Sequence, residues 1–172
     1  MNLINLKSGP ILSSGYRVTI KKPNIHNRIQ RDGNLFDIYE TVILNALNIA
    51  RVNCNWNNGK GFFNYMTQIY EILLNINPNI EILIINISKI CISIEDPDLF
   101  EQFNNDGKVI VAPAGTNADF FILKFAQMYQ NAVIISNDRF KEYMEIFKEA
   151  CMRRIPFMII KDEIIFYQEV GE

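Results

Sequence analysis

Apolar residues recur at intervals of three or four along several stretches of this chain, which is the spacing of one face of an α-helix. In the first stretch these positions are Phe36, Tyr39, Ile43, Leu47 and Ala50. Pro97 favours the start of another, shorter stretch, because proline is well tolerated in the first turn of a helix. The sequence therefore predicts helices over residues 35–50, 62–76, 97–105, 116–129 and 138–151.

Short apolar runs alternate with these helical stretches and predict strands over residues 16–20, 80–87, 108–112 and 132–136. The tail differs, because two apolar runs, 156–160 and 164–167, flank the polar Lys161-Asp162-Glu163. This pattern is typical of a terminal β-hairpin or a pair of edge strands. Alternating helices and strands predict an α/β fold with a mainly parallel sheet and helices on both faces. We expect one domain over residues 16–172, after a loose arm over residues 1–15 that contains several Ser, Gly and Pro residues.

Composition narrows the classes of function. The 172 residues include 17 Lys and Arg and 19 Asp and Glu, so the surface is not the strongly basic field of a dedicated duplex-DNA binder. Three cysteines and one histidine cannot complete a zinc quartet without a carboxylate, and they do not suggest a disulfide framework. The apolar runs are far shorter than the roughly 18 residues of a membrane span. We therefore expect a soluble, intracellular protein with no membrane partner.

Polar residues gather where two predicted strands end. Asp119 follows the strand 108–112 after a short turn, Asp138 follows the strand 132–136, and Glu142 lies one helical turn beyond Asp138. Ligands of open α/β sheets bind outside the carboxyl ends of the strands, so these carboxylates could share one crevice. Clustered carboxylates suit Mg²⁺ or Mn²⁺. Helix capping is the alternative, because Thr116-x-x-Asp119 resembles a capping box and Asp138 can serve as an N-cap.

Two segments carry a family resemblance. They are Ala118-Asp119-Phe120-Phe121-Ile122-Leu123-Lys124-Phe125-Ala126 and Ala132-Val133-Ile134-Ile135-Ser136-Asn137-Asp138-Arg139-Phe140. They resemble the NYN branch of the PIN-like ribonucleases, especially the Regnase group of CCCH zinc-finger endoribonucleases, in which an Asp-Asp pair opens the helix and Ser-Asn-Asp-aromatic ends the next strand. The tail over residues 154–166 also resembles the closing strands of that family.

The resemblance implies a PIN-like, Rossmann-like fold and metal-dependent cleavage of single-stranded RNA. Asp119 and Asp138 would hold Mg²⁺ or Mn²⁺, and Glu142 would ligate the ion or orient the attacking water. The partner would be single-stranded RNA, with a larger ribonucleoprotein or a homodimer as further assemblies. The rival interpretation is a degenerate nuclease fold that serves as an RNA-binding or protein-binding subunit.

The chain departs from the family at two acidic positions. Ala118 occupies the first position of the Asp-Asp pair. The family also opens with a strand ending in Asp-Gly-x-Asn, whose Asp is a principal metal-site residue, and we find no such signature. Fewer carboxylates predict weaker cation binding and, at most, slow cleavage.

Two placements of this opening motif compete. Ile20–Asn24 would retain Asn24 to position the water or the phosphate, but it puts Lys21 where Asp belongs. The segment near Val52–Asn55 lies closer to the next predicted helix, and Asp32 could enter the site from a loop. A Lys21 ammonium in the cleft would compete with the cation.

Basic side chains would contact the phosphates of a bound RNA. The candidates are Lys21, Lys22, Lys60 and Arg139, with Arg153 and Arg154 in addition. Each is equally explained as a solvated surface charge. We assign the aromatic side chains of the helices to the core and not to base stacking.

Overall fold

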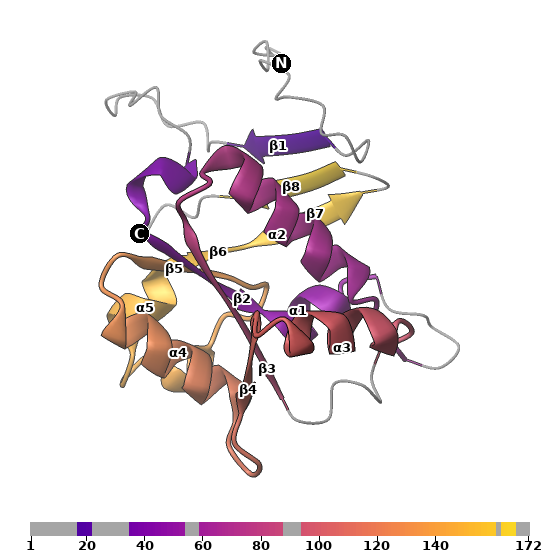
Figure 1. Cartoon of the computed structure of the whole chain (residues 1–172). Helices are drawn as coiled ribbons and strands as arrows, with labels where there is room; N and C mark the ends of the chain where they lie inside the picture. Colours follow the sequence, from indigo (N-terminus) through magenta and orange to yellow (C-terminus); the bar gives the residue numbers. More distant parts are fainter. Residues whose placement is uncertain (1–16, 22–34, 54–58, 88–93, 161–162, 168–172) are drawn as a thin grey trace.

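The structure, a computed structural model, describes residues 17–21, 35–53, 59–87, 94–160 and 163–167, and contains two sheets (Figure 1). The larger sheet is parallel throughout, with the order β4 (Val109–Ala112), β3 (Glu81–Ile87), β2 (Thr41–Asn45), β5 (Ala132–Ile135) and β6 (Arg154–Ile155). The smaller sheet has the order β1 (Arg17–Lys21), β8 (Glu163–Tyr167) and β7 (Phe157–Ile160). The predicted α/β fold with a mainly parallel sheet is confirmed.

Helices cover both faces of the larger sheet (Figure 1). The helical segments are η1 (Leu35–Ile38), α1 (Ala46–Ala50), α2 (Asn64–Ile76), α3 (Pro97–Asn105), α4 (Ala118–Met128), η3 (Lys141–Tyr143) and α5 (Lys148–Met152). The central strand β2 is buried on both faces: Leu44 packs with α1 and α2, whereas Ile43 packs with α4 and α5. No helix in the described part of the chain is long and apolar enough to cross a membrane.

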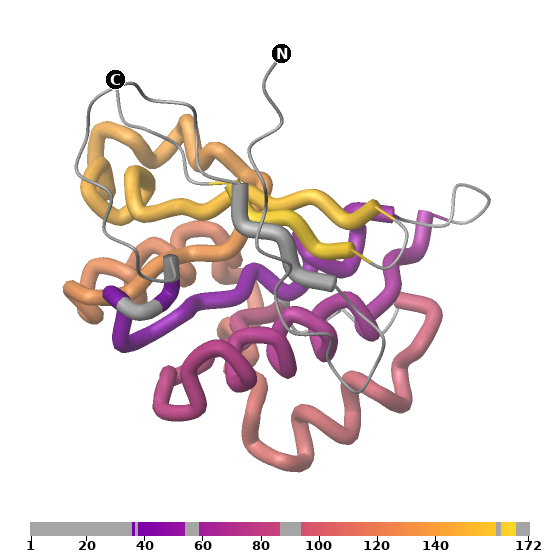
Figure 2. Tube along the Cα trace, turned by 90° about the horizontal axis from the view of Figure 1, so that it is seen from above, coloured from indigo at the N-terminus to yellow at the C-terminus, as the bar shows by residue number. Residues whose placement is uncertain are grey.

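The smaller sheet joins the two ends of the described chain. β1 pairs with β8 in parallel, and β7 pairs with β8 antiparallel, as the predicted hairpin requires. The rings of Phe36 and Phe166 meet edge to face at 5.2 Å, in the same core cluster as α2. Figure 2 shows the yellow strands side by side with the magenta helix α2 beside them. The predicted arm, residues 1–15, lies outside the described residues.

The prediction of one helix over residues 35–50 is wrong. Only the two ends of this stretch are helical, as η1 and α1, and its middle forms β2 between β3 and β5. The spacing of Phe36, Tyr39, Ile43 and Leu47 imitated a helical stripe, but Val42 and Leu44 between them are fully buried as well. A continuous apolar run bounded by polar residues is the pattern of a strand buried on both faces.

The prediction of one helix over residues 138–151 is also wrong. The chain forms the short η3, turns, and then forms α5. Phe140 has a left-handed backbone, with φ of 50°, which no continuous right-handed helix accommodates. The fully buried Phe140 ring and the backbone hydrogen bond from Phe140 N–H to the Asp138 carboxylate hold this conformation.

Candidate active site

The candidate site lies at the carboxyl ends of β2 and β5, next to the first turn of α4. Asn45 is the last residue of β2 and is 5% exposed. Its Nδ2 donates to Ser136 Oγ at 3.2 Å, just beyond β5, and to Asp119 Oδ1 at 3.4 Å, in the first turn of α4. The Asn45 carboxamide therefore joins two strands and a helix at one point.

Asn45 also begins the next helix. Its side-chain oxygen accepts from the Asn48 backbone N–H at 3.3 Å, so Asn45 is the N-cap of α1. Both polar atoms of the Asn45 carboxamide therefore have protein partners. The oxygen accepts from α1, as an N-cap does, and the nitrogen donates to Ser136 and Asp119. The described contacts thus direct the Asn45 oxygen to the helix and not to a cation.

Asp138 is held by a tight loop after β5. Its backbone N–H donates to Ser136 Oγ at 3.1 Å, and its Oδ1 accepts from Phe140 N–H at 2.8 Å. Asn137 N–H donates to Asn48 Oδ1 at 2.7 Å, and Asn137 Oδ1 accepts from the Phe157 N–H of β7 at 3.0 Å. These bonds fix the loop that carries Asp138 against both sheets.

The charges of two candidate carboxylates act on the third, Asp119. Partial burial raises the pKa of Asp119 above its ordinary value, and the negative charges of Asp138 and Glu142 raise it further. The hydrogen bond from Asn45 acts in the opposite direction. The expected convergence of Asp119, Asp138 and Glu142 therefore has electrostatic support, while their roles as metal ligands stay a prediction.

Tyr143 borders the same group of charges. Desolvation raises the pKa of its phenol, and the neighbouring Glu142 and Asp119 charges and a hydrogen bond with Glu142 add to this effect. The Tyr143 ring contacts Phe120, the residue that follows Asp119, with the ring centroids 6.3 Å apart. Two aromatic rings thus lie directly beside the acidic residues.

The predicted basic residues have different positions. Arg139 is exposed beside Asp138, and Lys60 lies half-buried ahead of α2. Arg153 and Arg154 turn inward: Arg153 donates to four backbone carbonyls, and the buried Arg154 donates to Ser136 O at 3.1 Å. We therefore remove these two arginines from the phosphate contacts. Lys22, Asn24 and Asp32 lie outside the described residues, as does the Lys21 side chain.

The number of carboxylates at the site determines whether it could chelate a bare cation or bind a hydrated one. In the described part of the chain, no three His, Cys, Asp or Glu side chains form a ready-made chelating group. A hydrated Mg²⁺ needs less, because this ion keeps several waters and takes one or two carboxylates together with substrate phosphates. Asp119 repelled by neighbouring carboxylates fits such a hydrated ion, since a cation would relieve the repulsion.

Residues 39–171 match the family described as the Zc3h12a-like ribonuclease NYN domain. The match covers well over half of the chain, so the chain belongs to this ribonuclease domain family. No curated protein sequence matches the chain.

Solved structures agree on the fold. The chain is similar to nuclear proteinaceous RNase P 2 (PRORP2) from A. thaliana, with a TM-score of 0.60 and 20% identity. A second structure of Arabidopsis thaliana nuclear protein-only RNase P 2 gives a TM-score of 0.59 and 17% identity. Each match covers 74% of this chain and 29% of the other, so the chain spans less than a third of the length of that protein.

One segment with the spacing of the family's opening motif escaped the sequence analysis. Asn45-Ala46-Leu47-Asn48 begins at the last residue of the central strand and has the spacing of Asp-Gly-x-Asn. On this spacing, Asn45 would correspond to the Asp of the motif and Ala46 to its Gly. The available signal was the run Val42–Leu44 followed by two Asn residues three positions apart, which the supposed helix over residues 35–50 concealed.

Proposed function

We propose that this chain is a slow endoribonuclease domain that cleaves single-stranded RNA with one hydrated Mg²⁺ or Mn²⁺ ion. The observation that supports this proposal is the position of Asp119, which Asn45 links to Ser136 at the end of β5. Partial burial raises the pKa of Asp119, and the charges of Asp138 and Glu142 raise it further. Like charges held together at the carboxyl end of a sheet cost free energy unless a cation joins them. Asp119 and Asp138 would hold the ion, and Glu142 would contact it or orient its water.

The roles of the protein groups follow from their positions. A divalent cation in such a site supplies a water of lowered pKa and offsets negative charge on the phosphate. Ser136 and Asn45 orient Asp119 and the Asp138 loop through their hydrogen bonds. The exposed Arg139 lies next to Asp138, where it can contact an RNA phosphate. Lys60, and Lys21, Lys22 and Asn24, stay candidates for RNA contacts.

A second candidate function, binding without cleavage, follows from two residues that lack a carboxylate. Asn45 and Ala118 replace two carboxylates of the family pattern, so the remaining set has a weaker attraction for a cation. A domain of this kind can keep the fold and bind RNA or a protein without cutting. The two proposals differ in a measurable way: the first predicts slow cleavage of RNA, and the second predicts none.

The decisive experiment is a cleavage assay with labelled single-stranded RNA in Mg²⁺, in Mn²⁺ and in chelator. We expect slow cutting that is faster in Mn²⁺ and absent in chelator. Asp138→Asn should abolish it, because the change removes a charge while the amide oxygen can still accept from Phe140 N–H. The matched control is Asp98→Asn, at an exposed position in the first turn of α3, which should cut like the parent protein.

Two results would contradict the enzyme proposal. RNA left intact in both cations favours the degenerate subunit. Cutting that persists in Asp138→Asn shows that the nuclease activity comes from another site or from a contaminant.

A further inference from the structure

An exposed aromatic surface adjoins the acidic residues. Phe120 directly follows Asp119 in the first turn of α4, and its side chain is 41% exposed, although aromatic residues of helices are usually buried. Its ring meets the buried Phe147 edge to face at 5.4 Å and the Tyr143 ring at 6.3 Å. We call the pair Phe120 and Tyr143 the aromatic ledge.

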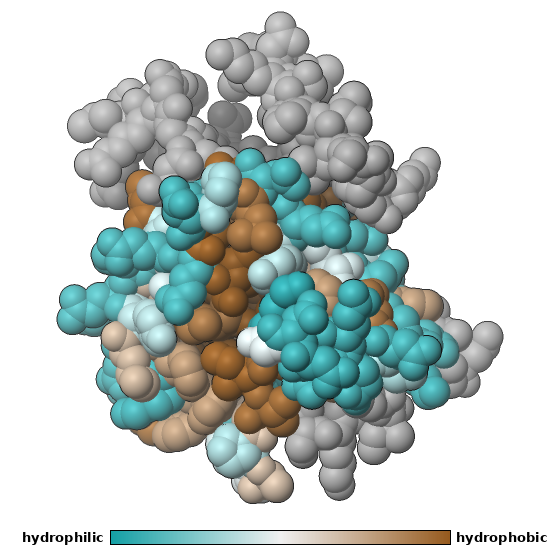
Figure 3. All heavy atoms as spheres, in the orientation of Figure 1, coloured by the Kyte–Doolittle hydropathy of each residue, from teal (hydrophilic) through white to brown (hydrophobic). Residues whose placement is uncertain are grey.

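One side of the Phe120 ring packs on the core, and the rest of the side chain is exposed to solvent. Phe147 is 5% exposed and belongs to the core beneath α4 and α5, so it holds the Phe120 ring in place. Figure 3 shows apolar atoms gathered over the surface of α4 and the neighbouring edge of the large sheet. A ring fixed by packing loses little conformational entropy when a flat ligand stacks on it.

The charges around the ledge suit a polynucleotide. Phe120 directly follows Asp119, Tyr143 directly follows Glu142, and the two ring centroids lie 6.3 Å apart, so the ledge and the acidic residues border one surface. Arg139 and Lys141 are exposed on the segment that leads to Tyr143. Aromatic faces flanked by cationic side chains form the usual platform for unpaired nucleotides, with the bases on the rings and the phosphates on the cations.

We propose that the aromatic ledge binds one unpaired nucleobase next to the phosphate that the acidic residues address. This inference rests on the proposed RNA substrate and adds the group that distinguishes single strands from duplexes. A base inside a duplex is already stacked on its neighbours and cannot lie on Phe120, whereas an unpaired base of any type has a face to offer. The ledge therefore selects for unpaired RNA with little sequence preference.

The test measures binding and not cleavage, by fluorescence anisotropy of a labelled uridine oligonucleotide in Ca²⁺ and in chelator. A second oligonucleotide of the same length carries abasic sugars, so it presents phosphates without bases. Phe120→Leu keeps an apolar side chain against Phe147 but removes the aromatic face. We expect it to weaken binding of the normal oligonucleotide about fivefold to tenfold and to leave binding of the abasic one unchanged.

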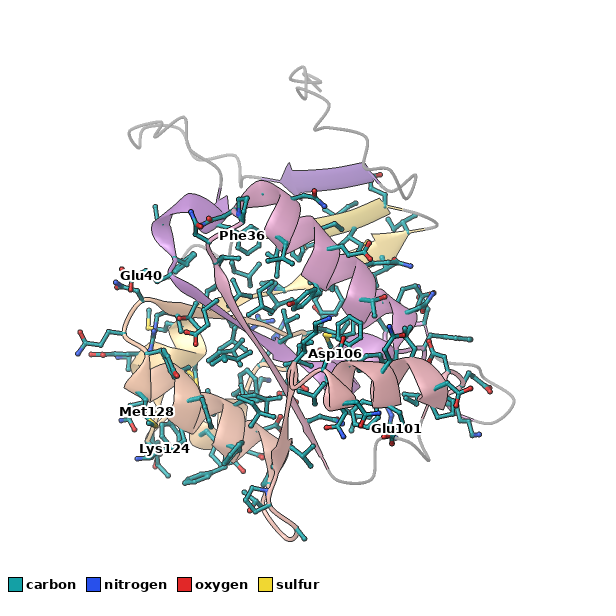
Figure 4. All side chains as sticks on the ribbon, viewed as in Figure 1. Phe36, Glu40, Glu101, Asp106, Lys124 and Met128 are labelled. Carbon is teal, nitrogen blue, oxygen red and sulfur yellow. The ribbon has the colours of Figure 1, made fainter. Side chains whose placement is uncertain are left out.

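Three further proteins complete the comparison. Phe120→Trp keeps an aromatic face and should bind the normal oligonucleotide at least as tightly as the parent. This variant therefore tests the ledge even if Phe120→Leu fails to fold. Tyr143→Leu removes the other ring of the ledge and should also weaken binding of the normal oligonucleotide. The control, Met128→Leu, changes an exposed side chain at the other end of α4, on the outer surface in Figure 4, and should have no effect.

The outcomes separate this inference from the proposed function. Equal loss of affinity for both oligonucleotides, no loss for either, or no RNA binding by the parent protein would overturn the ledge. Binding that depends on bases and on Phe120, in a protein that never cuts RNA, keeps the ledge and removes the nuclease. Cleavage with no dependence of binding on bases keeps the nuclease and removes the ledge.

Discussion

Replacing Asn45 with Asp should make the stability of the fold depend on a divalent cation. The change keeps the side-chain oxygen that caps α1 but exchanges the Nδ2 donor, 3.4 Å from Asp119 Oδ1, for a second carboxylate oxygen. Asn45 is almost fully buried, so water does little to screen the new charge. The parent amide lowers the pKa of Asp119, whereas Asp at position 45 would raise it.

The size of the effect follows from the geometry. Two unit charges at the 3.4 Å separation repel by about 5 kcal/mol at an effective dielectric constant of about 20. Protonation limits this penalty, because adding a proton at pH 7 to a carboxyl with an ordinary pKa of about 4 costs about 4 kcal/mol. We therefore expect Asn45→Asp to lower the free energy of unfolding at pH 7 by about 3–4 kcal/mol in chelator. A bound cation should recover much of this loss and should bind more tightly than in the parent.

The assay is urea unfolding followed by circular dichroism, in chelator and in a series of Mn²⁺ concentrations. The control is Asn45→Ser, which keeps a capping oxygen and removes the Nδ2 donor without adding charge, so it should lose about 1 kcal/mol and gain no response to Mn²⁺. If Asn45→Asp is as stable as the parent in chelator, the two side chains are not the close neighbours described above. If it is unstable and Mn²⁺ does not recover it, the acidic residues do not form a cation site.

Three other perturbations test the electrostatics and the architecture. The folded pKa of Asp119 lies above its ordinary value of 3.8, so between these two pKa values the folded state binds more protons than the unfolded state. The free energy of unfolding should therefore fall as the pH rises from 3.8 through the folded pKa, and should stay lower at higher pH. Asp119→Asn should remove that decline in urea titrations across pH 3–8, and an unchanged profile would contradict the pKa. Arg153→Ala should cost about 3 kcal/mol in chemical unfolding, since its guanidinium joins carbonyls at the end of α4 to carbonyls at the start of β5. A cost below about 1 kcal/mol would contradict that role. Asp96→Ala should cost about 1–2 kcal/mol in thermal unfolding, because both carboxylate oxygens accept from N–H groups at the start of α2. Asp96→Asn should recover part of this loss, and equal stability of the two variants would contradict the capping role.

The sequence was sufficient for the layers of the fold and for the neighbourhood of the acidic residues. The strand at residues 132–136 and the helix at residues 116–129 were predicted, because their apolar periodicities are unambiguous and turns separate them. This placed Asp119 after β4 and Asp138 after β5, where local spacing alone carries the information.

Two errors have one physical origin. Residues 41–45 and residue 140 take conformations that tertiary contacts impose: β2 lies between two strands distant in sequence, and Phe140 is held in a left-handed conformation by its burial and by Asp138. Local spacing does not report such contacts. The opening motif was lost with β2, since Asn45 was counted inside a helix. Phe120 was assigned to the core because periodicity does not show that its face of α4 is left partly uncovered.

The parallel pairing of β1 with β8 bears on the solubility of the domain. β8 pairs with its sequence neighbour β7 on one side, and on its other side with a strand from the opposite end of the described chain. Without β1, the edge of Ile164, Ile165 and Phe166 would offer unpaired backbone groups and apolar side chains to any extended peptide. Pairing with β1 therefore protects this edge against association with another molecule, so damage to β1 should promote aggregation.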